Sequence, residues 1–112
     1  MSECLFCRIV AGEIPAEIVL RTDDFVAFRD ISPQAPVHLL VIPVAHHANV
    51  GELAEADPIL AGRLLGAANE VAASEGLDDY RLVFNTGADA GQSVFHVHAH
   101  VLGGRSLTWP PG

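Results

Sequence analysis

Three histidines at alternate positions, His96, His98 and His100, are the residues of this chain best suited to chemistry. Small or branched apolar residues separate them, and a β-strand points alternate side chains to opposite faces. A strand over residues 93–102 would bury its apolar side, and we expect the three imidazole rings to converge on the other. Imidazole titrates near neutral pH and can attack as a nucleophile, move a proton or bind a metal. The spacing leaves two chemistries open: a metal site, or an imidazole nucleophile with imidazole helpers.

The two cysteines of the chain, Cys4 and Cys7, have the C-x-x-C spacing. In a cytosolic protein this spacing indicates metal binding or redox chemistry rather than a structural disulfide. A redox motif is expected where a strand runs into a helix, and no strand is predicted before Cys4. Two cysteines supply half of a tetrahedral zinc site, so the other two ligands must come from elsewhere in the chain.

Length and charge exclude several classes of protein. The chain of 112 residues is long enough for a single domain, which we expect to span residues 1–112. The formal net charge is −8 and every cationic residue is an arginine, without a basic run, which argues against binding to nucleic acid or to a membrane. No apolar stretch approaches the roughly 20 residues of a transmembrane helix, and the N-terminus has no signal-peptide pattern. We therefore expect a cytoplasmic protein.

The pattern of apolar residues predicts helices and strands in an order typical of an α+β fold. It indicates a short helix over residues 4–11, a β-hairpin over 18–20 and 25–28, and a buried strand over 38–43. Asp57 and Pro58 begin one long helix, which Gly76 ends. A strand over 80–85 and the histidine strand follow. We expect a five-stranded antiparallel sheet with one short N-terminal helix and one long helix, both on one side of the sheet.

Two loops next to these strands carry further polar groups. A loop over residues 30–36 with two prolines precedes His38, and His46 follows the strand that His38 opens. Gly91, Gln92 and Ser93 come directly before the histidine strand, where backbone N–H groups and a hydroxyl can face an anion. By itself such a loop is a common turn, so its meaning depends on the histidines beside it.

With these residues placed, the chain resembles the histidine-triad (HIT) proteins over nearly all of its length, from about residue 4 to residue 112. The alternation of histidine with apolar residues over 96–101 carries the resemblance. The segments 91–98, 102–105 and 109–112, the last of which reads Trp-Pro-Pro-Gly, are similar to the Hint branch in particular. The resemblance implies a HIT-like fold and hydrolysis of the P–N bond of purine nucleoside 5′-phosphoramidates. The activity would be of the adenosine 5′-monophosphoramidase or AMP–lysine hydrolase type and would proceed through a nucleotidyl-histidine intermediate.

The resemblance also implies a role for each matching residue. His98 would be the nucleophile, and Ser93 would face the charge that develops on the phosphate. The histidines around the nucleophile would be His38, His96 and His100. Asp30 would bind the ribose hydroxyls. The purine slot would be lined by Phe6, Ile9, Phe28, Ile31 and Leu40. The phosphate side would be held by Asn85, Gly91, Gln92, Ser93 and Val94.

Bacterial relatives, and the distantly related galactose-1-phosphate uridylyltransferases, hold a zinc ion with C-x-x-C and two histidines. The matching ligands here are Cys4, Cys7, His46 and His96, and this set suits a closed structural zinc site. A zinc-bound His96 cannot also move protons, so His100 or His38 would then carry that work. The phosphoramidase chemistry itself requires no metal.

The family further implies a homodimer in which the Trp109 segment reaches toward the partner's active site. One departure is at Val44 and Ala45, where the family usually has basic residues close to the phosphate or leaving group. Two other functions stay open. One is hydrolysis of dinucleoside polyphosphates, as in the fragile-histidine-triad branch, which normally lacks the Trp-Pro-Pro-Gly ending. The other is that of a nucleotide-binding regulatory or scaffold protein with incidental turnover.

Overall fold

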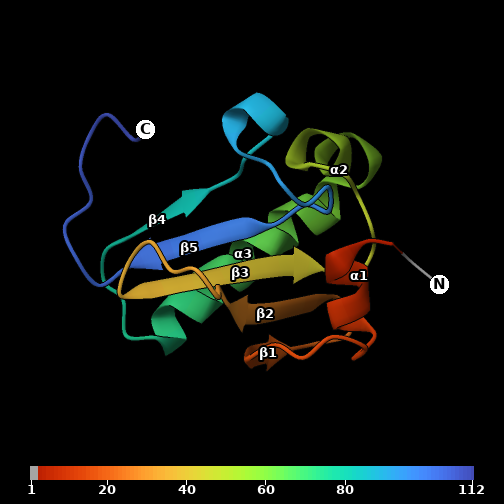
Figure 1. Cartoon of the computed structure of the whole chain (residues 1–112), viewed down its shortest axis with the longest axis horizontal. Coiled ribbons are helices and arrows are strands. Elements are labelled where there is room, and N and C mark those ends of the chain that lie inside the picture. The colour runs from red at the N-terminus through yellow and green to blue at the C-terminus, as the bar shows by residue number, and fades with distance from the viewer. Residues whose placement is uncertain (1–2) are drawn as a thin grey trace.

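The computed structural model describes residues 3–112, which form a five-stranded sheet with helices packed around it (Figure 1). The strands are β1 (Ile18–Arg21), β2 (Phe25–Arg29), β3 (Val37–Pro43), β4 (Tyr80–Val83) and β5 (Ala99–Gly103). The helices are α1 (Leu5–Val10), α2 (Val50–Ala56), α3 (Pro58–Ser74) and the short 3-10 helix η1 (Ala88–Ala90). The strand order is β1-β2-β3-β5-β4 and each neighbouring pair is antiparallel. This confirms the α+β fold with a short N-terminal helix and a long helix.

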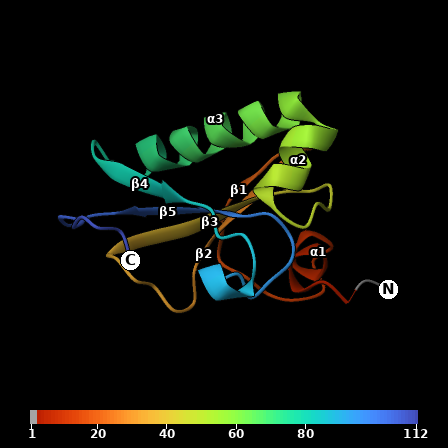
Figure 2. The same ribbon diagram turned by 90° about the horizontal axis from the view of Figure 1, so that it is seen from above.

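The two faces of the sheet are covered by different helices. Leu39 and Val41 of β3 belong to the apolar core beneath α3, whereas Leu40 and Ile42 belong to a second cluster beneath α1. Figure 2 shows α3 over one face and α1 on the other side of the sheet. The expectation that both helices lie on one side is wrong for α1. The second face of the central strands is apolar as well, and it is buried because α1 packs against it.

The long helix α3 begins where the sequence predicts. The side chain of Asp57 accepts the N–H of Leu60 at 3.0 Å, and Pro58 occupies the first helical position, where its missing N–H costs no bond. After the helix, Gly76 adopts a φ of +75°, which closes the turn at little steric cost. Within residues 3–112, no helix combines the length and the apolar character needed to cross a membrane.

Helix α2 is absent from the sequence-based expectation. Asn49 caps it by accepting the N–H of Glu52 at 2.9 Å, and Leu53 is its one buried residue. A helix of 7 residues with a single buried side chain has no apolar stripe for a pattern to detect.

The histidine strand is shorter than the predicted range of residues 93–102, because β5 begins at Ala99. Val41 pairs with Ala99. If this register continued, Ile42 would face His98 and Pro43 would face Val97, but Pro43 has no N–H to donate. The Pro43 carbonyl instead accepts the ring N–H of His96 at 2.8 Å, and the N–H of Val97 donates to the His47 carbonyl at 2.7 Å. Residues 96–98 are therefore held by a side chain and a neighbouring loop rather than by the sheet.

Candidate active site and metal centre

A cavity of about 300 Å³ opens on the α1 face of the sheet, between α1, the loop after β2 and the segment before β5. Ten residues that the sequence singles out for the nucleotide line it: Phe6, Ile9, Phe28, Asp30, Ile31, Leu40, Ser93, Val94, His98 and His100. Sequence reasoning missed five further lining residues: Leu5, Ile14, Pro15, Ala16 and Arg29. The proline turn before β1 was the one available signal for this wall, because it rigidly returns the chain toward α1.

Three residues expected on the phosphate side do not line the cavity. The Asn85 amide donates to the Ala90 carbonyl at 2.8 Å, and Gly91 adopts a φ of +91° that ends η1. Gln92 is buried, with its Oε1 accepting the Gly87 N–H at 2.9 Å and its Nε2 donating to the Ala48 carbonyl at 2.7 Å. These residues shape and brace the loop that carries Ser93, and this role explains their types without contact to a ligand.

The His98 ring lies in the cavity wall in one defined tautomer. Its Nδ1 lies 2.8 Å from the His96 carbonyl, and a carbonyl accepts, so Nδ1 carries the proton. Nε2 is left with its lone pair. Phe6 packs edge-on against the ring, with 5.1 Å between centroids and an interplanar angle of 89°. Burial lowers the pKa of His98 below its ordinary value, so the ring is neutral at pH 7.

A chain of hydrogen bonds assigns the tautomers of the two neighbouring histidines. The Gln34 N–H donates to His38 Nδ1 at 3.0 Å, so His38 carries its proton on Nε2. That Nε2 lies 2.9 Å from His100 Nδ1, which accepts it and leaves His100 with an N–H at Nε2. The His98 and His100 rings lie 4.9 Å apart, centroid to centroid. Burial, with the adjoining His98 and His38, lowers the pKa of His100 to about 4. At neutral pH the cavity therefore offers a nitrogen lone pair beside a neutral N–H donor.

Asp30, His38 and His100 lie close enough together to suggest a cation site. The tautomers argue against one. A metal on His38 Nε2 would force the proton onto Nδ1, where it would meet the Gln34 N–H head-on at 3.0 Å. The Asp30 carboxylate lies 3.4 Å from His38 Nε2, and its other oxygen accepts the Ser32 N–H at 2.8 Å. The contacts within this cluster instead fix the orientation of the His38 and His100 rings.

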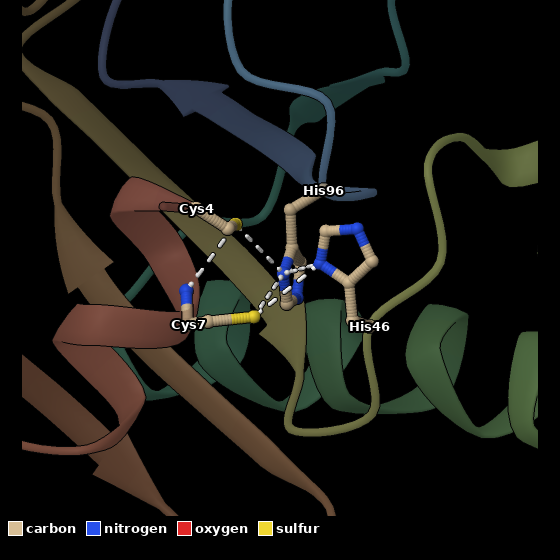
Figure 3. A group of neighbouring side chains, drawn as sticks. All are labelled: Cys4, Cys7, His46 and His96. Atoms are coloured by element: carbon tan, nitrogen blue, oxygen red, sulfur yellow. Dashed lines mark hydrogen bonds between the residues drawn. The ribbon is translucent and has the colours of Figure 1, made fainter. Parts of the chain in front are cut away.

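His96 does not join the other two triad rings, so the expectation that all three converge is wrong. Its ring is fully buried and directed toward the N-terminus of α1 (Figure 3). Its Nε2 donates to Pro43, so Nδ1 is the atom that bears the lone pair. That atom lies 3.5 Å from Cys4 Sγ, 3.5 Å from Cys7 Sγ and 3.1 Å from His46 Nδ1. His96, which the sequence predicts both as a catalytic group and as a metal ligand, therefore lies with the other metal ligands.

These four ligand atoms, of Cys4, Cys7, His46 and His96, all lie within 4.8 Å of one another. Around a tetrahedral zinc, two nitrogens lie about 3.4 Å apart and a nitrogen and a sulfur about 3.6 Å apart, given the usual bond lengths. The separations here are 3.1 Å between the two nitrogens and 3.3 to 3.5 Å between nitrogen and sulfur. The donor set and its spacing fit a Cys₂His₂ zinc site.

Local structure explains why these ligands meet. Cys4 is the N-cap of α1, where its Sγ accepts the Cys7 N–H at 3.4 Å, and Cys7 follows one turn later on the same side. His46 lies on the exposed loop between β3 and α2. Bonds from the Val97 N–H to the His47 carbonyl and from Gln92 to Ala48 tie this loop to the segment that carries His96.

Two other positions noted in the sequence lie away from this site. Val44 and Ala45 are exposed beyond the end of β3 and do not line the cavity, so the absence of basic residues there removes no group from its wall. The segment after β5 lies at the end of the sheet away from α1 (Figure 1). In it, the Trp109 ring is 81% exposed, with the Arg81 guanidinium 6.0 Å from its centroid.

Comparison with known proteins places this fold and site in a family. A family model described as the HIT domain matches residues 11–107. An uncharacterized HIT-like protein of Synechococcus elongatus is 53% identical over 114 aligned positions, covering 100% of both chains. A HIT family hydrolase from Legionella pneumophila shares 50% identity at a TM-score of 0.93, covering 98% of this chain and 100% of its own. A histidine triad nucleotide-binding protein from Candida albicans shares 30% identity at a TM-score of 0.83, with coverage of 96% and 83%. The chain belongs to the HIT domain family.

Proposed function

We propose that this protein is a purine nucleoside phosphoramidase, which hydrolyses the P–N bond that joins a nucleoside 5′-phosphate to an amine. The observation that carries the proposal is the His98 ring, whose Nδ1–H is bonded to the His96 carbonyl and whose Nε2 lone pair is available at the cavity. The likeness to a HIT family hydrolase and to a nucleotide-binding protein of the same family supports the reaction type and the ligand class.

The chemistry follows from the two tautomers. Nε2 of His98 attacks phosphorus, the P–N bond breaks, and a nucleotidyl-histidine forms while the His96 carbonyl stabilises the charge on the ring. The departing amine takes up one proton from solvent water, and the Nε2–H that the neutral His100 ring retains can donate a hydrogen bond to the leaving nitrogen or to a phosphate oxygen. In the second step water attacks phosphorus, the bond from phosphorus to Nε2 of His98 breaks, a proton of the attacking water passes to solvent, and the nucleotide is released.

The cavity suits a nucleoside monophosphate. Its apolar half can enclose a purine ring, Asp30 offers carboxylate oxygens to ribose hydroxyls, and Ser93 offers a hydroxyl and a backbone N–H to the phosphate. Arg29 is the one arginine lining it among residues 3–112, and its guanidinium is already bound to Glu17 at 2.7 Å and to Glu75 at 2.8 Å. A site without an unengaged fixed cation favours a singly charged phosphoramidate over a polyphosphate.

We further propose that Cys4, Cys7, His46 and His96 hold a structural zinc. When bound, zinc would fix two loops and the start of α1 without taking part in the reaction. The family resemblance also supports a cytoplasmic homodimer with the Trp109 segment near the partner's cavity. Metal analysis, expected to give about one zinc per chain, and sedimentation, expected to give a dimer, test these two proposals.

An assay of AMP release tests the function directly. The substrates are adenosine 5′-phosphoramidate, diadenosine triphosphate and diadenosine tetraphosphate, and the chains are the unsubstituted protein, His98→Ala and the control His47→Ala, whose side chain lies outside the cavity. We expect fastest turnover of the phosphoramidate, no turnover by His98→Ala, and an adenylate adduct on His98 in quenched reactions. Faster turnover of a diadenosine polyphosphate would favour that activity instead, and tight nucleotide binding without turnover would favour a regulatory role.

A further inference from the structure

His96 connects the metal centre to the candidate nucleophile within a single residue. Its ring Nδ1 faces Cys4, Cys7 and His46, and its ring Nε2–H is bonded to the Pro43 carbonyl. Its own carbonyl accepts the Nδ1–H of His98 at 2.8 Å. The bond that leaves Nε2 of His98 unprotonated is therefore made by the backbone of a metal-site residue.

We propose that the metal centre fixes the tautomer and orientation of His98 through the main chain of His96. This makes His96 a positioning residue and the centre part of the catalytic apparatus, although no ligand atom lies in the cavity wall. The inference rests on the proposed roles of His98 as nucleophile and of the four residues as a zinc site.

The backbone of residues 96–98 depends on anchors outside the sheet, because β5 begins at Ala99. One anchor is the bond from the His96 ring to Pro43, and the other is the bond from the Val97 N–H to the carbonyl of His47. His47 directly follows the ligand His46. A cation that joins His46 and His96 would close these connections into one rigid unit and set the direction of the His96 carbonyl.

Loss of the cation would remove the interaction that joins the His96 ring to the other three ligands. With Nε2 of His96 bonded to Pro43, its Nδ1 lone pair faces the Nδ1 of His46 at 3.1 Å and two sulfur atoms at 3.5 Å. Without the cation, only weak hydrogen bonds that use thiol or imidazole protons join these atoms, so the His96 ring is held less firmly. Its carbonyl then moves, and His98 can carry its proton on Nε2 instead, where no lone pair remains for attack. The fraction of reactive His98 therefore falls.

Two substitutions of His46 separate the metal from the nucleophile. His46 is exposed and does not line the cavity. His46→Ala removes a ligand, and His46→Cys replaces it by another good zinc ligand. The measurements are zinc content, far-UV circular dichroism, kcat and KM for adenosine 5′-phosphoramidate, and the ¹⁵N shifts of the His98 ring at one pH.

We expect zinc-free His46→Ala to lose about tenfold in kcat, which is the effect of about one net hydrogen bond on a rate. Its His98 nitrogens should report a mixture of tautomers, whereas the unsubstituted chain shows Nδ1–H alone. His46→Cys should restore zinc, kcat and the single tautomer. Stepwise removal of zinc from the unsubstituted chain with a chelator should lower kcat and the Nδ1–H fraction in proportion.

Several results would overturn the inference. These are a zinc-free chain with unchanged kcat and one His98 tautomer, a chain that takes up no zinc, or unfolding of the whole sheet when zinc leaves, which would make the centre a general scaffold. Failure of the proposed function looks different. In that case no preparation turns over the phosphoramidate, but the ¹⁵N shifts still follow zinc content.

Discussion

Replacement of His100 by asparagine is expected to make the protein more resistant to acid. His100 is held neutral in the folded chain because burial and two neighbouring imidazoles lower its pKa to about 4, whereas an unfolded histidine titrates near 6.5. Asparagine places an amide oxygen close to the position of Nδ1. It can therefore still accept the N–H of His38, but it does not take up a proton.

The sign and size of the effect follow from the two pKa values. As the pH falls below 6.5 the unfolded chain binds a proton at His100, and the folded chain does not do so until about pH 4. The stability that His100 contributes is therefore complete above pH 6.5 and is lost through that window. The loss amounts to about 2 kcal/mol at pH 5 and about 3 kcal/mol at pH 4.

Urea unfolding at pH 8, 5 and 4 measures this loss in the unsubstituted chain and in His100→Asn. The metal centre is common to both chains and cancels in the difference between the two curves, whereas His38 and His98 contact His100 and their titration is part of the measured effect. The free energy of unfolding of His100→Asn should fall less with acid, by the amounts above. Two curves that stay parallel from pH 8 to pH 4 would refute the assignment of His100 as a buried neutral imidazole.

Three further substitutions test other parts of the structure. Ile31 is 98% exposed, so Ile31→Ser should change stability by no more than about 0.5 kcal/mol but raise KM about fivefold; an unchanged KM would remove it from the purine slot. Arg29→Ala breaks the bonds to Glu17 and Glu75 and should cost about 1–2 kcal/mol in urea unfolding at low salt; full stability would show that these pairs contribute little. Leu64→Ala, on the buried face of α3, should cost about 3 kcal/mol in thermal unfolding with KM unaltered, and a large rise in KM would contradict the separation of the two faces of the sheet.

Much of the fold follows from the apolar pattern of single segments. The continuous run of β3 requires burial on both faces, and the capping pair Asp57 and Pro58 marks the start of α3. Neither of these two segments indicates on which face of the sheet α1 packs. The packing of α1 depends on whether the Leu40 face of the sheet or the Leu39 face remains uncovered, and this is decided only when the strands have assembled.

The site likewise contains residues whose positions the local sequence pattern predicts and residues whose positions it does not. Alternation correctly pairs His98 with His100 because both lie close to the regular part of β5. It fails for His96, where Pro43 cannot continue the ladder and the ring turns to the cysteines of a distant helix. Gln92 likewise has the residue type of a phosphate contact, but its amide is fully used in bracing two loops. A local pattern gives the direction of a side chain only as far as the local geometry persists.

Because α1 is short, its amide hydrogen exchange depends on the contacts that the helix makes. A helix of 6 residues does not hold its shape alone in water. Helix α1 carries Cys4 and Cys7 toward the metal centre, and Phe6 and Ile9 toward the cavity. Its amide protons are therefore protected from exchange only as long as those contacts persist. The rate of hydrogen–deuterium exchange along α1 therefore reports whether the metal centre and the cavity are occupied.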